Sequence, residues 1–174
     1  MIIRIILIYT IFFLYSSSAL SVNIRVLDFQ KIIDNNKSLI LFYEQIKKDQ
    51  ESHKVEFKIE ESNLQNELER IEELNLILDS NELEKELNDY NKKLNNFNSK
   101  IQQFNLHYEK QINNFKNQII NLTLEVLKKY SDVNKIDLIL DSNSYILSSN
   151  SINITELIED QINNKKIEIN LEKY

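Results

Sequence analysis

Apolar residues recur at alternating spacings of four and three through residues 83–126. The series is Leu83, Leu87, Tyr90, Leu94, Phe97, Ile101, Phe104, Tyr108, Ile112, Phe115, Ile119, Leu122 and Val126. This is the a/d spacing of a coiled coil, in which one apolar stripe packs against a partner helix. Two successive four-residue steps, at Phe104, Tyr108 and Ile112, form a stutter at which a supercoil locally unwinds. The pattern predicts a long amphipathic helix.

A second, weaker series precedes the first. It comprises Tyr43, Ile46, Gln50, His53, Phe57, Glu61, Leu64, Leu68, Ile71, Asn75 and Leu78, and four of these eleven residues are polar or titratable. When the chain is folded back at Ser80-Asn81, the two series come into register. The opposed pairs are then Leu78 with Leu83, Ile71 with Tyr90, Leu64 with Phe97, Phe57 with Phe104, and Ile46 with Phe115. We therefore predict an antiparallel coiled-coil hairpin with a seam that includes Leu64, Leu68, Ile71, Leu78, Leu83, Leu87, Tyr90, Leu94, Phe97, Ile101 and Phe104.

Charge supports this hairpin. Residues 44–78 hold ten acidic and five basic residues, net −5, whereas residues 90–129 hold two acidic and seven basic residues, net +5. The opposite charges favour the antiparallel pairing, although each exposed ion pair contributes only about 0.2–1 kcal/mol. Each series carries one stutter, and the hairpin places the two stutters side by side. We expect the weakest seam packing, and any bending, at this point.

The two ends of the chain predict short strands and helices. The stretch IRVLDF reads as a strand that ends at Asp28, which caps a short helix through FQKII. IDLIL and SYIL read as two short strands, with Asp141, Ser142 and Asn143 as the turn of a β-hairpin between them. INITELIEDQI reads as a helix with Thr155 at its N-cap. Three short strands with open edges favour pairing with other copies of the chain.

The expected fold class is therefore mostly α with a small β part (α+β). A long antiparallel coiled-coil arm, residues 43–126 with its tip near 79–82, projects from a small β-rich oligomerisation body. The body comprises residues 22–42 and 127–174.

Asn, Asp and Ser mark the turns, because the chain contains no Gly and no Pro. Asn and Asp are the non-glycine residues that best tolerate a positive φ. The clusters are Asn35-Asn36, Asp79-Ser80-Asn81, Asp141-Ser142-Asn143, Ser149-Asn150 and Asn163-Asn164. Asp79 is expected to cap the second long helix.

Composition argues against an enzyme. Phosphate-binding loops, dinucleotide fingerprints and nucleophile elbows all need glycine, and thiolate catalysis and cysteine-type zinc sites need Cys, which the chain also lacks. Asp137, Asp141 and Ser142 are a candidate acid, base and nucleophile, but no histidine is near them in sequence, and the turn interpretation is favoured. The hairpin brings His53 and His107 near one another without a clear third ligand, so neither a metal nor a cofactor is expected.

The first 21 residues resemble a secretory signal peptide. Arg4 is their only charge, and the apolar run of residues 5–15 is shorter than the roughly 20 residues that span a bilayer. Ser17 and Ala19 place small side chains before a cleavage point after Ala19, and a cut after Ser21 is the alternative. An uncleaved membrane anchor remains the second interpretation. After cleavage the charge is −7, from 20 basic and 27 acidic residues, which argues against nucleic acid as a partner.

Both ends of the chain, with the coiled coil between them, resemble the Skp (OmpH-like) family of periplasmic chaperones. The opening IRVLDFQKII and the ending KYSDVNKIDLILDSNSYILSSNSINITELIEDQI carry the resemblance. Asp137, Asp141, Asn153, Ile154 and Thr155 occupy the family's positions in that ending. The resemblance implies a homotrimer in which a small β-rich body carries three helical arms. Unfolded outer-membrane proteins would be held between these arms without ATP, in the periplasm.

Three features depart from the family pattern. Asn134-Lys135 stand where the family often has glycine. The tip, residues 79–89, has five acidic residues and one basic residue, which makes contact with lipopolysaccharide or an anionic membrane doubtful. The final KKIEINLEKY extends past the usual end, and its alternating Ile167, Ile169 and Leu171 predict either an extra strand or a loose tail.

Two functions remain open, a holdase for unfolded outer-membrane proteins and a structural or scaffolding coiled coil of the envelope, anchored by an uncleaved N-terminus. The holdase predicts client contacts by apolar residues off the seam, namely Val55, Ile59, Leu74, Ile77 and Leu106. The trimer predicts body contacts by Val26, Leu138, Leu140, Tyr145 and Leu147. A pure scaffold has no need of the strand and helix stretches IDLILDSNSYIL and INITELIED.

Overall fold

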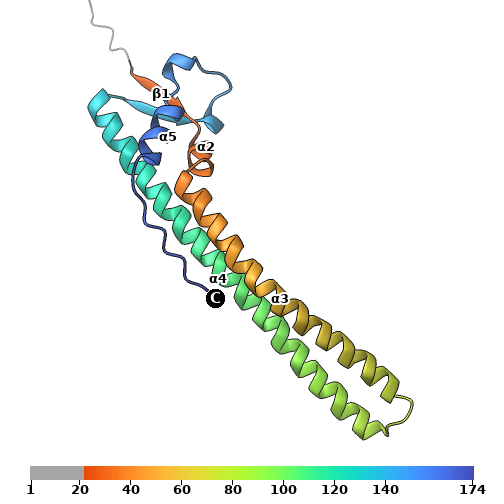
Figure 1. The fold of residues 1–174 in the computed structure, drawn as a ribbon. Coiled ribbons are helices and arrows are strands. Elements are labelled where there is room, and N and C mark those ends of the chain that lie inside the picture. Colours follow the sequence, from red (N-terminus) through yellow and green to blue (C-terminus); the bar gives the residue numbers. More distant parts are fainter. Residues whose placement is uncertain (1–21) are drawn as a thin grey trace, which may run out of the picture.

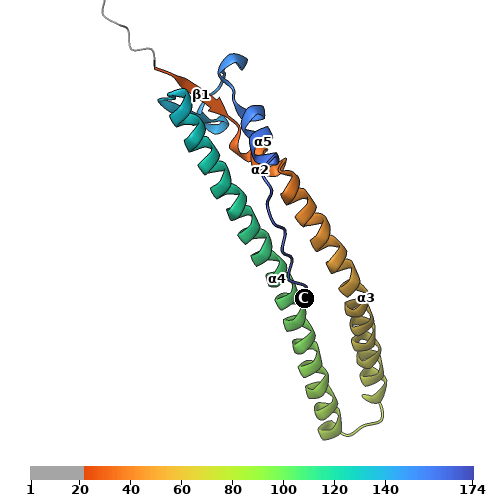
Figure 2. The ribbon, with the colours of Figure 1, turned by 60° about the vertical axis from the view of Figure 1, so that its left-hand side comes forward.

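The structure is a computed structural model that describes residues 22–174; the predicted signal peptide lies outside the described residues. Two long helices form an antiparallel arm, and the short elements gather at one end of it (Figures 1 and 2). The elements are β1 (Ile24–Leu27), α2 (Phe29–Asp34), α3 (Lys37–Leu74), α4 (Ser80–Asn134), β2 (Leu138–Asp141), the 3-10 turns η1 (Ser142–Ser144) and η2 (Asn150–Ile152), and α5 (Thr155–Asn163). The predicted helical hairpin and mostly α class are confirmed.

The arm is made of α3, with 38 residues, and α4, with 55 residues and a length of about 80 Å. The chain reverses in residues 75–79, slightly before the predicted Ser80-Asn81, which form the first turn of α4. Asp79 is the N-cap of α4 as predicted, and its carboxylate accepts hydrogen bonds from the backbone N–H groups of Asn81 and Glu82. The cap satisfies donors that have no partner inside the helix.

The predicted register is confirmed in the middle of the arm, and near the body Phe115 gains an aromatic partner that the register did not name. Phe57 lies against Phe104, with ring centroids 4.9 Å apart, as predicted. Phe115 stacks on Phe42 with ring centroids 4.4 Å apart, and both lie in the same buried cluster as Ile46, the predicted partner of Phe115. Phe42 is buried and Tyr43 is 36% exposed, so the inclusion of Tyr43 in the seam is wrong. The helix starts at Lys37, and its buried stripe is Leu39, Phe42 and Ile46, a spacing that rotates the neighbouring Tyr43 away.

The body contains less β structure than expected. β1 and β2 pair in parallel, from Ile24 with Leu138 to Leu27 with Asp141, so the predicted β-hairpin is wrong. Parallel strands need a long crossover, and the whole helical arm supplies it. After β2 the chain enters η1, and the SYIL stretch is not a strand in the described part of the chain. The other edge of β1 makes an isolated parallel bridge from Val26 to Asn153, supported by a hydrogen bond from the Ile154 N–H to the Val26 carbonyl.

Two apolar clusters form the core. The arm cluster comprises Ile33, Leu39, Phe42, Ile46, Phe104, Tyr108, Phe115 and Ile119. The body cluster comprises Leu27, Ile32, Val126, Leu127, Ile154, Ile158 and Ile162, contributed by β1, α2, α5 and the end of α4. Because α4 contributes to both clusters, it connects the arm to the body.

Every Asn, Asp or Ser cluster lies at the end of an element, as predicted. Asn36, Asp79, Asp141 and Ser149 are side-chain N-caps of α3, α4, η1 and η2. None of them supplies the left-handed backbone for which Asn was expected; within residues 22–174 that conformation occurs at Lys135, with φ 52°.

Thr155 is not the N-cap of α5, contrary to prediction. Helix α5 begins at Thr155, and the capping oxygen comes from Asn153, whose Oδ1 accepts the Thr155 backbone N–H at 2.9 Å. The Thr155 hydroxyl donates to the same Oδ1 and accepts the backbone N–H of Asp28. Thr155 thereby joins the start of α5 to the end of β1.

Candidate functional site

The acidic residues near β2 hold the body together. Asp137 Oδ2 accepts the Asn23 backbone N–H at 2.7 Å, and Asp141 Oδ1 accepts the Phe29 backbone N–H at 2.9 Å. The Phe29 N–H, which stabilises the carboxylate, lowers the pKa of Asp141 below its ordinary value. Both carboxylates therefore connect β2 to the segments that flank β1. The two histidines lie on the arm, in α3 and α4, and do not join these residues in a common site.

His53 and His107 lie in an aromatic cluster halfway along the arm. We call it the aromatic junction and define it as His53, Phe104, His107, Tyr108 and Tyr174. The ring of Tyr174 lies edge-on to His53 at 5.7 Å, to Phe104 at 5.1 Å and to His107 at 5.6 Å. Among residues 22–174, no three His, Asp or Glu side chains are close enough to hold a metal ion.

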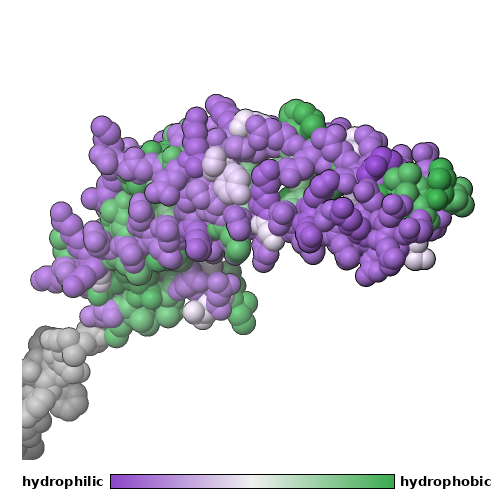
Figure 3. Space-filling view, turned by 90° about the horizontal axis from the view of Figure 1, so that it is seen from below, coloured by the Kyte–Doolittle hydropathy of each residue, from purple (hydrophilic) through white to green (hydrophobic). Residues whose placement is uncertain are grey.

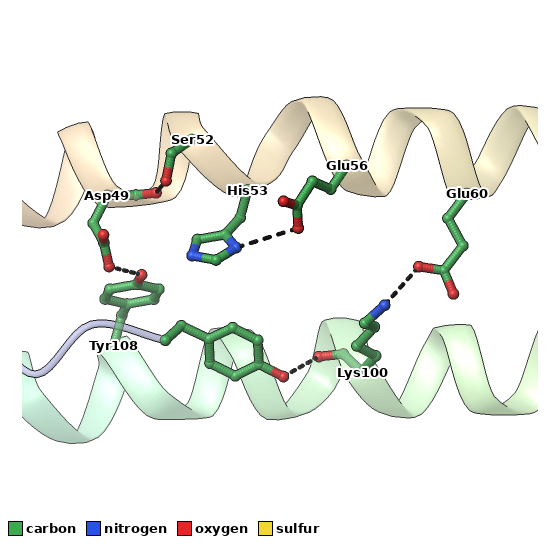
Figure 4. A network of polar contacts seen from close by, with 8 residues as sticks. Asp49, Ser52, His53, Glu56, Glu60, Lys100 and Tyr108 are labelled. Atoms are coloured by element: carbon green, nitrogen blue, oxygen red, sulfur yellow. Dashed lines mark hydrogen bonds and ion pairs between the residues drawn. The ribbon is translucent and has the colours of Figure 1, made fainter.

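Tyr108 and Lys100 provide polar links between the helices at this level (Figure 4). The Tyr108 hydroxyl donates a hydrogen bond to Asp49 Oδ2 at 2.5 Å. The pKa of Tyr108 is raised, mainly because the hydroxyl is buried and also because it makes this hydrogen bond. Lys100 Nζ donates to Glu60 at 2.8 Å, which raises the pKa of Lys100. Tyr108 is 1% exposed, so the expectation of weak packing at the stutter is wrong: aromatic side chains fill the space.

Ion pairs connect α3 to α4 along the outer arm. Lys93 pairs with Glu67 at 2.6 Å, and Arg70 pairs with Glu86 near the tip. The pairs of Lys93 with Glu67 and of Lys100 with Glu60 join a base of α4 to an acid of α3 and follow the predicted charge complementarity. The pair of Arg70 with Glu86 has the opposite arrangement, with the base on α3 and the acid on α4. All these side chains are partly exposed, so the ion pairs favour one alignment of α3 with α4 over others and add little to the stability of the fold.

Residues 165–174 form neither a strand nor a loose tail. This segment, which we call the strap, runs in extended form along the arm beside both helices (Figures 1 and 2). Ile167, Ile169 and Leu171 are half-buried and pack against the arm cluster. The alternation of these residues is visible in the sequence, but their partners on the arm are not.

The predicted client-contact residues lie along the arm without forming one pocket. Val55, Ile59, Ile77 and Leu106 are 64%, 58%, 81% and 45% exposed, and Leu74 is half-buried. Leu76, which sequence reasoning missed, is 88% exposed. It lies beside Ile77 in the turn at the tip, where a hydrophobic patch stands out from a polar surface (Figure 3). Its exposure could have been predicted from the sequence, because Leu76 lies off the seam and next to Ile77.

The predicted body-contact residues differ in exposure. Val26 is 2% exposed and belongs to the interior of one subunit. Leu140 and Tyr145 are half-buried, whereas Leu138 and Leu147 are 45% and 89% exposed. Ile146, also missed, is fully exposed at 104%. The exposed residues lie on β2 and on the irregular segment that follows η1.

The predicted seam residues differ in burial along the arm. Leu64, Ile71, Phe97 and Phe104 are buried, and Leu87 is 38% exposed. The other seam residues are half-buried: Leu68, Leu78, Leu83, Tyr90, Leu94 and Ile101.

No helix within residues 22–174 is long and apolar enough to cross a membrane.

Comparison with known proteins agrees with this architecture. The family model described as "Outer membrane protein (OmpH-like)" matches residues 23–162. The fold resembles the crystal structure of a protein from Caulobacter crescentus that is described as a candidate OmpH-like outer membrane chaperone. The TM-score is 0.65, the sequence identity is 14%, and the match covers 82% of this chain and 84% of that one. No curated protein matches the sequence.

The family match includes β1, the arm and α5, and stops before the strap. Because the matched family is one of chaperones, it agrees with the expectation that the protein is not an enzyme. The chain belongs to the OmpH-like (Skp) family.

Proposed function

We propose that the protein is a periplasmic holdase that binds unfolded outer-membrane proteins between its arms and prevents their aggregation without ATP. The observation that carries this proposal is the set of exposed apolar side chains spread along the arm. Val55, Ile59 and Leu106 lie on its length, and Leu76 and Ile77 at its tip. Dispersed weak contacts hold an unfolded chain and still release it without an energy source, whereas one deep pocket would trap it.

The proposed holdase is a homotrimer, an assembly that the family resemblance implies. In one subunit, Ile146 and Leu147 are almost fully exposed, and the two-stranded sheet leaves an edge of β2 open. Exposed apolar residues beside an unpaired strand edge favour association with another chain. Light scattering after gel filtration tests this assembly, and a clean monomer would contradict it. Leu147→Asp is expected to shift the mass towards the monomer, whereas Val133→Asp, at an exposed site on α4, serves as its control.

The holdase activity is tested by diluting a denatured β-barrel membrane protein into buffer with and without this protein. We expect less light scattering from aggregates at a threefold excess of subunits. Unchanged scattering would refute the holdase and leave the envelope scaffold as the remaining function. The intact mass of the protein from the periplasm tests export: a chain that begins near Leu20 or Val22 indicates cleavage, and a full-length chain indicates an anchor.

A further inference from the structure

The strap occupies a groove between α3 and α4. Its residues Ile169 and Leu171 face the arm cluster, and its last residue, Tyr174, contacts His53 on α3 and His107 on α4. The strap does not fill the groove. A hollow of about 610 Å³ remains beside it, lined by Gln45, Lys48, Asp49 and Ser52 of α3 and by residues 169–173.

Gln111 on α4 binds the backbone of the strap. Its amide Oε1 accepts the Glu172 backbone N–H at 2.9 Å, and its Nε2 donates to the Glu172 carbonyl at 2.8 Å. His107 Nε2 lies 2.8 Å from the same carbonyl. A side-chain amide that pairs with both backbone groups of one residue imitates the hydrogen bonds of a neighbouring strand. This contact recognises an extended backbone and is independent of the side chain that the residue carries.

The aromatic junction supplies the second contact. Tyr174 inserts edge-on among His53, Phe104 and His107, and its hydroxyl donates to the Lys100 carbonyl at 3.4 Å. Edge-on packing suits any aromatic side chain of similar size. The groove therefore combines an apolar floor for alternate side chains, a clamp for one backbone unit and a socket for an aromatic ring.

The strap is only partly buried on the arm. Within residues 22–174 it belongs to no strand, its three aliphatic side chains are only half-buried, and Tyr174 is 39% exposed. Ordering ten residues loses conformational entropy, which opposes the contacts that hold the strap and lowers the free energy needed to displace it.

We propose that this groove is a binding site for extended peptide segments with alternating apolar residues and a nearby aromatic residue, and that the strap is its internal occupant, which a client segment displaces. The displacement by a client rests on the proposed holdase function, whereas the peptide site does not. Segments of this pattern are what an unfolded β-barrel protein presents, because its strands alternate apolar and polar side chains. The site lies within a single arm, formed by α3, α4 and the strap of one chain.

A labelled peptide with the sequence KKIEINLEKY tests the groove directly by fluorescence anisotropy. We expect saturable binding to a variant that ends at Asn164, and much weaker binding to the full chain, in which the strap competes. Gln111→Leu in the shortened variant is expected to weaken binding about tenfold, since it removes two neutral hydrogen bonds. Gln118→Leu, at an exposed site on the same helix, leaves binding unchanged. A peptide with serine in place of Ile167, Ile169 and Leu171 is expected not to bind.

The same question is answered in the full chain, in case the shortened variant folds poorly. The chain lacks Cys, so Gln111→Cys with Glu172→Cys introduces a single pair that a short bismaleimide links across the groove. Because Gln111→Cys itself removes the clamp, the linked variant is compared with the same variant before linking, and linking is expected to abolish the peptide binding that remains. Tyr174→Ala, which keeps Gln111, is expected to increase peptide binding. If the peptide binds neither the shortened variant nor the Tyr174→Ala variant, the proposed peptide site is wrong.

Client displacement is measured separately. If the strap occupies the groove about nine-tenths of the time, its removal strengthens client binding about tenfold. An unfolded β-barrel protein is also expected to compete with the labelled peptide. If the full chain prevents aggregation but the client does not compete, client displacement is wrong and the holdase stands. If the peptide binds but aggregation is unaffected, the holdase is wrong and the peptide site stands.

Discussion

Lys135 adopts a left-handed backbone, with φ 52° and ψ 51°, immediately after α4. The family often has glycine at this turn, and only glycine adopts this conformation without steric conflict. The turn is held by hydrogen bonds from the Lys135 and Ile136 N–H groups to the Ser131 carbonyl, and Asn23 Nδ2 donates to the Lys135 carbonyl. These bonds keep the strained residue in place where α4 turns into β2.

Lys135→Gly is expected to stabilise the protein by about 1 kcal/mol, because it removes the conflict of the Lys135 Cβ with the backbone. Urea denaturation at fixed protein concentration measures this change, since the stability of an oligomer depends on concentration. Lys135→Ala keeps a Cβ and is the matched control. Equal stability of the glycine and alanine variants would contradict the explanation.

Asp141 makes the body sensitive to acid. Its pKa is lowered, because the Phe29 N–H stabilises the charged form. The stability from this group is therefore fully present above the ordinary value of 3.8 and is lost as the pH falls from there through the lower folded value. We expect the free energy of unfolding of the native protein to fall more steeply below about pH 4 than that of Asp141→Asn. Asp132→Asn, an exposed neighbour, is expected to keep the native slope; equal slopes for all three proteins would refute this role.

At the scale of elements, the register of the arm is decided where it joins the body. Phe42 and Tyr43 are neighbours, and heptad counting placed Tyr43 in the seam. In the structure Phe42 is 1% exposed and stacks on Phe115, because α3 must also bury Leu39 against the arm cluster. The burial of Leu39 and Phe42 in the arm cluster therefore sets the rotation of α3 at this end.

The pair also provides a test. Phe42→Ala is expected to lower the free energy of unfolding by about 3–5 kcal/mol, because it removes a buried ring and leaves a cavity. Tyr43→Ala is expected to change it by less than about 1 kcal/mol, as an exposed site. Urea denaturation of the two variants distinguishes the registers, and the reverse order would restore the heptad assignment.

At the scale of the whole molecule, the arm presents a narrow polar rod with a hydrophobic tip. Leu76 and Ile77 are exposed in the turn, and the neighbouring residues 79–89 carry five acids and one base. This charge opposes binding to an anionic surface, so the tip suits an apolar polypeptide better than an anionic membrane.

Leu76→Ser combined with Ile77→Ser is expected to weaken binding of an unfolded β-barrel protein about fivefold, because it removes two exposed apolar contacts. Circular dichroism is expected to remain unchanged, since neither side chain packs in the seam. Val133→Ser, exposed on α4 near the body, is the control. If the tip variant binds the unfolded protein as tightly as the native protein does, the tip is not part of the client-binding surface.

Local patterns in the sequence determined the elements that depend on near neighbours. The heptad spacing of Leu83 to Val126 specified α4, the aligned series specified the fold-back, and Asp28 and Asp79 specified helix starts, because helix periodicity and capping act within a few residues.

Tertiary structure decided the contacts between distant segments. The parallel pairing of Ile24 with Leu138 joins segments separated by the whole arm, and a short apolar run such as SYIL carries no signal for its partner. The place of Tyr174 between His53 and His107 likewise depends on a groove that exists only after both helices have packed. Alternation in the strap predicted an extended backbone, and only the packed arm decided what that backbone lies against.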